Sequence, residues 1–331
     1  MKSLSNTVIA RLQADMRLPD LRGTRYHLVR YVAGGGMGRV WLAEDTVLNR
    51  RVALKVLDLV VAADDLDVRL LREARALAAL EHPGIVPVHD AGTLPDGRAF
   101  YCMKYVEGQT LTKHISILNL ADKLRLLERI AEPLDFAHAR GFIHRDLKPD
   151  NIMIGAFGEV LVMDWGLAKC CATNLKNGET EIDASSQPTQ KSSFGTCQGS
   201  VLGTRGYMSP EQARGDIEVD QHTDIYSLGA ILAFMLTGAT PSELSLSNAG
   251  VPRQLRAICE KAMAADASAR YQSAREMTTD ITHYLNGESV SACPENLIVR
   301  SRRVFARHRT AIVLVAAYLT MRLMFILLSR H

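Results

Sequence analysis

The sequence of 331 residues lacks the cysteine spacings that mark a disulfide framework or a zinc site. It contains no C-x-x-C pair, and no histidine stands at metal-ligand spacing from its six cysteines, which are Cys102, Cys170, Cys171, Cys197, Cys259 and Cys293. We therefore expect reduced thiols in a cytosolic setting. The N-terminal residues 1–17 also lack an apolar run long enough to form a signal peptide.

Acidic residues are missing from one end of the chain, residues 300–331, which hold seven arginines. The whole chain carries a net charge of +3, but residues 1–299 hold 32 basic and 36 acidic residues, a net charge of −4. A mildly acidic body lacks the basic face that nucleic acids require, so we expect no nucleic-acid partner. With 47% hydrophobic residues, the chain can bury a core large enough for two lobes or two small domains.

The first third of the chain is rich in short β-type segments separated by turns, and no internal repeat interrupts it. The turns are GGGMG (34–38), DTVLNR (45–50) and PDG (95–97). Alternation and β-branched residues predict strands over 27–33, 39–44, 51–59, 85–92 and 98–106. Residues 1–24 show no pattern and are predicted to form a flexible lead-in.

A predicted helix between the third and fourth strands carries a charged residue on its apolar face. That face is formed by Leu66, Leu70, Leu77 and Leu80. Glu73 falls on the same face, and a buried carboxylate is costly unless it meets a cation. Lys55, in the strand 51–59, is a candidate cation, and the pair would leave its ammonium aimed at an anion. The alternative for Lys55 is a solvated lysine at a sheet edge.

The rest of the chain is mainly helical. Periodic apolar residues predict helices over 119–140, 223–236, 252–264 and 273–286. Pro133 lies within the first of these helices, where it removes a backbone hydrogen bond and favours a kink. Residues 170–200 are rich in Ser, Thr, Gln, Gly and Asn and predict a long loop. A β-rich front and a helical rear indicate an α+β fold in two lobes.

The segment HRDLKPDN, residues 144–151, carries three polar side chains of different chemistry within one short loop. Asp146 can accept a proton from a hydroxyl, Lys148 can neutralise a phosphoryl group, and the amide of Asn151 can ligate a hard cation. Thirteen residues further on, the apolar strand VLVMDWG ends in Asp164, a second oxygen ligand. Each fragment alone has a purely structural explanation, and a glycine-rich turn such as 34–38 is usually a tight hairpin. Their order and spacing together favour phosphoryl transfer.

With these motifs in this order, the sequence resembles bacterial serine/threonine protein kinases of the eukaryotic-like type over residues 25–287. The resemblance implies a bilobal kinase fold, with a β-rich N-lobe over 25–106 that carries one key helix and a mostly helical C-lobe over 107–287. It also implies transfer of the γ-phosphoryl group of ATP, with Mg²⁺ or Mn²⁺, to serine and threonine hydroxyls of proteins.

The resemblance assigns a role to each motif residue. It makes Asp146 the catalytic base, places Lys148 at the γ-phosphate, and assigns Asn151 and Asp164 to the metal. The residues that it places around ATP are Lys55 paired with Glu73, the turn residues Ala33, Gly34, Gly35, Gly36, Met37 and Gly38, the adenine contacts Val40, Ala53 and Met153, the gatekeeper Met103, and the hinge Lys104, Tyr105 and Val106. The structural residues that it implies are Glu211, which pairs with Arg270, and Asp224, which braces the catalytic loop.

Three features depart from the family pattern. Ala33 replaces the first glycine of the loop, Trp165 replaces the phenylalanine that follows the metal-binding aspartate, and the segment 238–252 is too short for the usual docking helix and loop. Ala33 and the short segment 238–252 motivate one rival interpretation, a scaffold with a kinase fold and little catalysis. A second rival is a phosphotransferase acting on small molecules, but the segments SPE (209–211) and DIYSLG (224–229) fit protein kinases better.

The segment from Asp164 to Glu211 is long and its middle is rich in Ser and Thr. By the resemblance, Arg145 would clamp a phosphorylated residue of this loop, and we predict autophosphorylation at Thr196 and Ser200. Thr204 would instead contact Asp146 and Lys148. The alternative is that these hydroxyls only solvate a loop. A homodimer that phosphorylates itself in trans is the expected partner besides protein substrates.

Residues 311–328 form an apolar run broken only by Arg322, and at a rise of ~1.5 Å per residue it spans about 27 Å. Its ten Leu, Ile, Val and Phe residues contribute roughly −3 to −6 kcal/mol to insertion, against about +2.5 to +3.5 kcal/mol for a central arginine. We therefore predict a transmembrane helix over 310–329 after a basic juxtamembrane linker over 288–309. The five arginines at 300–309 predict a single-pass protein of the inner membrane with its kinase domain in the cytoplasm. An interfacial helix is the alternative, but no polar face is evident.

Overall fold

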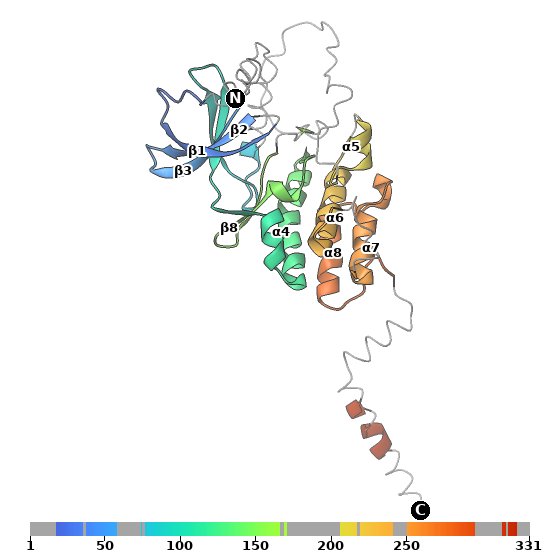
Figure 1. Cartoon of the computed structure of the whole chain (residues 1–331). Coiled ribbons are helices and arrows are strands. Elements are labelled where there is room, and N and C mark those ends of the chain that lie inside the picture. Colours follow the sequence, from blue (N-terminus) through green and yellow to red (C-terminus); the bar gives the residue numbers. More distant parts are fainter. Residues whose placement is uncertain are drawn as a thin grey trace, which may run out of the picture.

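The computed structural model describes residues 18–35, 38–57, 74, 77–165, 169–170, 206–216, 219–240, 250–294, 313–315 and 317–322. A β-sheet is followed along the chain by a group of helices that lie side by side (Figure 1). The sheet is antiparallel, with the order β1-β2-β3-β5-β4. Its strands are β1 (Tyr26–Gly35), β2 (Gly38–Asp45), β3 (Arg50–Val56), β4 (Val88–Thr93) and β5 (Ala99–Lys104).

The two faces of this sheet pack into different cores because side chains alternate along each strand. On the outer face, Val52, Leu54 and Val56 of β3 join a local cluster that includes Tyr26 and Trp41. On the inner face, β3 and β5 contribute to the main core, which continues into the helices, through Ala53, Leu57, Tyr101 and Met103. Lys55 lies on this inner face, at the register position between Val40 and Tyr101.

The helical part is organised around α6, of which nearly every residue from Thr223 to Met235 is buried. Helices α4 and α7 pack against it, α8 packs against α4 and α7, and shorter elements complete this part. The bounds are β6 (Gly108–Thr110), α3 (Leu111–His114), η1 (Ile115–Ile117), α4 (Leu120–Ala139), β7 (Phe142–Ile143), η2 (Pro149–Asn151), β8 (Ile152–Gly155), β9 (Val160–Val162), β10 (Lys169–Cys170), α5 (Pro210–Arg214), α6 (His222–Thr237), α7 (Arg253–Ala262), η3 (Ala267–Ala269) and α8 (Ala274–Leu285).

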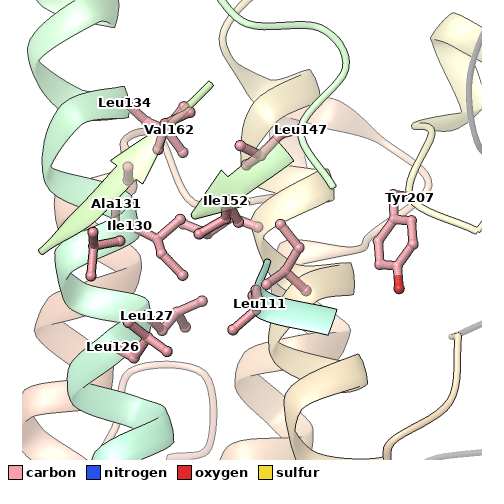
Figure 2. Close-up of a cluster of buried hydrophobic side chains, with 14 of the residues drawn as sticks. Leu111, Leu126, Leu127, Ile130, Ala131, Leu134, Leu147, Ile152, Val162 and Tyr207 are labelled. Atoms are coloured by element: carbon pink, nitrogen blue, oxygen red, sulfur yellow. The ribbon is translucent and has the colours of Figure 1, made fainter. Parts of the chain in front are cut away.

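Helix α4 forms one wall of the main core, and side chains from the strands β8 and β9 and from the loop before them pack against it (Figure 2). Leu147, which lies between two polar residues of the loop 144–151, is 1% exposed in this core. A buried leucine in the middle of a polar segment fixes the positions of the side chains on either side of it.

Pro133 lies inside α4 without ending the helix. It is buried, and it packs against Gly84, where an added Cβ would come within 3.0 Å of the Pro133 Cγ atom. The four predicted helices over 119–140, 223–236, 252–264 and 273–286 are confirmed, with ends that differ by at most two residues. Of the predicted helix that carries Glu73, the described residues Leu77 and Leu80 are buried as expected, whereas Glu73 lies outside the described residues.

The predicted lead-in, residues 1–24, is only partly described. Its described residues, 18–24, contact the sheet, whereas residues 1–17 lie outside the described residues. The Arg98 guanidinium donates a 2.8 Å hydrogen bond to the carbonyl oxygen of Leu18, and Asp20 N donates to the Asp96 carboxylate. Leu21 packs against the outer cluster. Apolar packing and hydrogen bonds thus order a segment in which the sequence shows no periodicity.

Near the C-terminus the structure describes helical residues 313–315 and 317–322, whose side chains are exposed. Among the described residues, no helix combines the length and the apolar character needed to cross a bilayer. Most of the predicted span 310–329 and of the linker 288–309 lies outside the described residues.

Candidate active site

The loop 144–151 connects β7 to β8 and is held in place by hydrogen bonds to Asp224 of α6. The backbone amides of His144 and Arg145 donate to the two carboxylate oxygens of Asp224, at 2.8 and 2.9 Å. Arg145 has a φ of 69°, a left-handed conformation that a side chain with a Cβ rarely adopts. Strain of this kind persists only where surrounding contacts hold it in place, and the two bonds to Asp224 are such contacts.

Asp224 is fully buried and has a third partner. The Nε2 atom of His138, in α4, lies 2.7 Å from its Oδ2 atom. Burial alone would raise the pKa of the Asp224 carboxyl, but the hydrogen bond and charge of His138, with further contributions from His144, hold it below its usual value. The ionised carboxylate therefore joins α4, α6 and the loop at one point.

Asp146, Lys148 and Asn151 converge within this loop. The Lys148 ammonium lies 2.7 Å from Asp146 Oδ2. Asn151 is 7% exposed, and its Nδ2 atom donates to the backbone oxygen of Asp146 at 2.8 Å and to Oδ2 at 3.3 Å. The carboxylate of Asp146 is thus oriented by a cation and an amide while its side chain remains partly accessible to solvent.

Asp164 follows β9 and faces Lys55 of the sheet. Its carboxylate lies 2.5 Å from the Lys55 ammonium, which is almost completely buried, whereas the Asp164 side chain is 49% exposed. Partial burial would raise the pKa of Asp164, but the charge and hydrogen bond of Lys55 outweigh it and lower the pKa. Asp164 also has a positive φ of 60°. The contact joins the inner face of the sheet to the strand pair β8–β9.

Trp165 takes the place after Asp164 and is completely buried. Its indole Nε1 donates to the backbone oxygen of Val162 at 3.3 Å, and its ring centroid lies 4.8 Å from that of His144. His144 Nε2 in turn lies 2.9 Å from the Met163 oxygen. The larger ring is accommodated because its one polar atom finds a backbone acceptor, so the departure at this position does not disturb the site.

The described members of the predicted nucleotide-binding set lie on strands of the sheet, in the segment that follows β5, and on β8. Strand pairing places Ala33 opposite Val40, and Ala53 opposite Met103. At the end of β5, Lys104 N donates to the Pro87 oxygen at 3.1 Å, and Val106, beyond the strand, is buried. Gly36 and Met37 lie outside the described residues. The other predicted members of this group are Gly34, Gly35 and Gly38 at the turn between β1 and β2, Lys55 on β3, Tyr105 after β5 and Met153 on β8.

Gly38, the last residue of the turn, has a φ of 142°. A Cβ atom at this position would stand 2.5 Å from the backbone oxygen of Val56 on β3. Glycine is required here because the backbones of β2 and β3 approach closely. At Gly34, by contrast, the obstacle to a Cβ is the hydroxyl of Tyr31, a movable side chain.

The pair Glu211 and Arg270 lies behind the site. Arg270 is 2% exposed and binds both carboxylate oxygens of Glu211, at 2.7 and 2.8 Å. Burial would raise the pKa of Glu211, but the hydrogen bonds from Arg270 overcome it and lower the pKa to about 2. The predicted phosphorylation sites Thr196 and Ser200, and Thr204, lie outside the described residues.

No group of three or more His, Cys, Asp or Glu side chains in the described part of the chain is arranged to hold a metal ion. Asp164 and Asn151 offer one carboxylate and one amide, and Asn151 uses its nitrogen for Asp146. Such a partial set fits Mg²⁺, which proteins commonly bind through one or two carboxylates together with substrate phosphates and water.

A family model for the protein kinase domain matches residues 26–326. The chain belongs to the protein kinase family. The chain is 38% identical over 297 residues to a probable serine/threonine-protein kinase PknB of Bifidobacterium longum, and the match covers 81% of this chain and 40% of that protein. It is 35% identical over 315 residues to the serine/threonine-protein kinase PknD of Protochlamydia amoebophila, with 84% and 32% covered. The chain thus spans less than half the length of these relatives.

Among solved structures, the chain is similar to the PknI kinase domain of Mycobacterium tuberculosis, with a TM-score of 0.60 and 28% sequence identity over 81% of this chain and 99% of that domain. This similarity and the family match confirm the predicted bilobal α+β kinase fold. The five-stranded sheet and the helical part correspond to the two lobes of that fold.

Sequence reasoning did not identify His138, whose ring is a partner of Asp224 in the structure. His138 and Asp224 are separated by 86 positions, and nothing in the sequence around His138 indicates the contact. A hollow beside Asp146 was also not predicted. It is lined by residues of the catalytic loop, of the segment before α5 and of α6, namely Arg145, Asp146, Leu147, Lys148, Tyr207, Met208 and Ser227.

Proposed function

We propose that this chain transfers the γ-phosphoryl group of ATP, with a divalent cation, to serine and threonine hydroxyls of proteins. The arrangement of Asp146, Lys148 and Asn151 in one braced loop is the observation that carries the proposal. Asp146 would accept the proton of the attacking hydroxyl, and Lys148 would offset the charge of the phosphoryl group. Asn151 and Asp164 would hold Mg²⁺ or Mn²⁺, which neutralises phosphate charge when bound.

On the opposite side of the site, Lys55 would contact the α- and β-phosphates with support from Glu73. Its ammonium already lies at a carboxylate assigned to the metal, so phosphates bound there would meet a lysine and a cation together. Val40, Ala53 and Met153 would contact the adenine base, and the segment Lys104–Val106 would form its hinge. The inner face of the sheet is apolar around Lys55, which suits a flat base.

The scaffold interpretation has no support from this arrangement, because the described catalytic side chains retain their charges and their contacts. The relatives named as serine/threonine-protein kinases favour protein hydroxyls over small molecules as acceptors. Neither Ala33 nor Trp165 removes a charged group from the site.

Phosphate transfer from radiolabelled ATP to a mixture of purified proteins tests the proposal. Asp146→Asn should lower the rate at least 100-fold, because general-base catalysis contributes about 10²- to 10⁴-fold. Asp150→Asn is the matched control, since this neighbouring carboxylate is exposed and contacts Thr112 at 2.8 Å. Equal rates for the Asp146→Asn variant and the unmodified chain would favour the scaffold, and label found only on small molecules would favour the second rival.

The chain should also phosphorylate its own loop at Thr196 and Ser200, with one copy acting on another. Mass spectrometry of the 170–204 peptide after incubation with ATP checks the sites. Mixing the Asp146→Asn variant with the unmodified chain checks the direction, because only transfer between copies labels the inactive variant. An unmodified peptide in both samples would exclude autophosphorylation in this segment.

Residues 310–329 are proposed to anchor the kinase in the inner membrane, with its kinase domain on the cytoplasmic side. The apolar sequence around the exposed helical residues 313–315 and 317–322 supports this role, as do the arginines at 300–309. Leu314→Arg together with Leu319→Arg should release the chain into the soluble fraction in a carbonate wash, because two central arginines outweigh the insertion energy of the run. Release of the unmodified chain would contradict the anchor.

A further inference from the structure

Strand β1 pairs with β2 through two β-bulges, one between Leu28 and Arg30 and one between Tyr31 and Ala33. Each bulge places an extra residue on β1 and shifts the alternation of its side chains. As a result, Arg30 stands opposite Leu42, and Leu42 stands opposite Ala53. Since Ala53 belongs to the inner face, Arg30 lies on the inner face as well. A long cationic side chain is thereby directed to the face that carries Lys55.

The guanidinium of Arg30 reaches the segment that follows β5. Its Nη2 atom donates a 3.0 Å hydrogen bond to the hydroxyl of Tyr105, and its Nη1 atom donates to the Tyr31 backbone oxygen at 3.3 Å. The second bond ties the fork to its own strand. The Tyr105 ring is partly buried against the main core, together with Val40. Both ends of the contact are therefore held by the fold.

The Arg30–Tyr105 contact joins β1 to the segment directly after β5, and these two strands do not pair with each other in the sheet. In the sheet, β1 and β5 are separated by β2 and β3, so three inter-strand spacings of ~4.8 Å, about 14 Å in all, lie between them. The row that starts with Arg30 continues through Leu42 and Ala53 to Met103 on β5, and Tyr105 follows Met103 by two residues, so the two ends of the contact lie beside this row. They thus border the position at which the adenine base would contact Ala53.

We infer that the Arg30–Tyr105 bridge positions the base of the bound nucleotide by holding β1 to the segment that follows β5. The inference rests on the proposed ATP site. Arg30 and Tyr105 are positioning residues, because neither lies at the Asp146–Lys148–Asn151 cluster or at the Lys55–Asp164 pair. The bridge acts on the base and the ribose and leaves the phosphate contacts to Lys55.

Nucleotide binding to the full chain, measured with a fluorescent ATP analogue, tests the bridge without requiring turnover. Arg30→Ala and Tyr105→Phe should each weaken binding roughly three- to tenfold, the range of one lost hydrogen bond. The double variant should bind no more weakly than either single variant, because both remove the same bond. In transfer assays, KM for ATP should rise by the same factor while kcat is unchanged. Arg22→Ala, which removes an exposed arginine that pairs with Asp20, is the matched control and should change neither value.

Competition with fragments of the nucleotide separates the bridge from a simple charge effect. Adenosine should lose affinity for the Arg30→Ala variant by the same factor as the analogue, whereas inorganic triphosphate should not. The inference is overturned if triphosphate loses affinity and adenosine does not, if Tyr105→Phe is silent, or if the two single effects add. Melting temperatures of the variants identify any loss of fold. If the unmodified chain binds the analogue and transfers no phosphate, the proposed function fails while the bridge stands or falls on the binding constants.

Discussion

The catalytic loop, residues 144–151, and the glycine-rich turn, residues 33–38, lie on opposite sides of the same site but are held by different kinds of contact. The loop is fixed by the buried carboxylate of Asp224 and by Leu147 in the main core. The turn belongs to an edge strand with two bulges, and its longest-range tie is the exposed bond from Arg30 to Tyr105. The catalytic loop is therefore held by buried contacts, whereas the described residues of the turn and of β1 are held by fewer and more exposed ones.

The difference follows from what each side has to do. A base and a lysine that act on one phosphoryl group lose catalytic power if they are displaced by about 1 Å, so their positions must be fixed. A turn that covers phosphates has to admit and release a nucleotide, which favours a small number of weak contacts. Substitutions on the two sides should accordingly differ in size and in the quantity that they change.

The largest effect is expected from Asp224→Ala. It removes the acceptor of two backbone amides and of His138, all in a buried setting, and should lower the free energy of unfolding by about 3 to 5 kcal/mol. Because Arg145 would relax from its strained φ, the transfer rate should fall at least 100-fold. Urea unfolding and kcat measure the two effects. The control Asp220→Ala, at an exposed carboxylate before α6, should cost at most about 1 kcal/mol.

Arg270→Met should have the next largest effect, on stability more than on chemistry. It leaves Glu211 without its buried cation and should lower the free energy of unfolding by about 3 kcal/mol. The folded-state pKa of Glu211, about 2, lies below the ordinary value of 4.5. The stabilisation is therefore fully present above pH 4.5 and is lost as the pH falls towards 2. The free energy of unfolding, measured at several pH values in this range, should depend less steeply on pH in the variant. An unchanged slope against pH would show that other carboxylates dominate acid unfolding.

Much of the catalytic loop could be predicted from the sequence because its functional side chains are close together in the chain. Asp146, Lys148 and Asn151 lie within six consecutive positions, and their chemistry is evident from the residue types alone. The strands could be predicted because β3 alternates between two apolar faces. The contacts of His138 and of Arg30 could not be predicted. The first depends on helices that cross far apart in sequence, and the second depends on bulges that alter the alternation without changing composition.

In the glycine-rich turn, Gly38→Ala should have a larger effect than Gly34→Ala. Its Cβ would meet the Val56 backbone oxygen at 2.5 Å, and a strand backbone cannot swing aside. We expect a loss of about 1 to 3 kcal/mol in the free energy of unfolding and a higher KM for ATP. Gly23→Ala is the control, because Gly23 also has a positive φ but nothing lies within 4 Å of its Cβ position. Equal losses at both positions would mean that backbone conformation, and not contact with β3, sets the cost.

Gly34→Ala should have the smallest effect, and a second substitution should cancel it. The added Cβ would meet the hydroxyl of Tyr31, the end of a half-exposed side chain that packs edge-on against Trp41 at a centroid distance of 5.3 Å. The ring can move, so we expect a loss below about 1 kcal/mol, and Tyr31→Phe alone should be neutral within about 0.5 kcal/mol.

Tyr31→Phe removes only the colliding oxygen, so the double variant should recover the stability and the KM of the unmodified chain. Thermal unfolding and ATP titration of the four proteins complete this cycle. Additive losses would mean that the glycine is required by the path of the turn itself. The glycine-rich turn would then be constrained by its backbone, as the catalytic loop is.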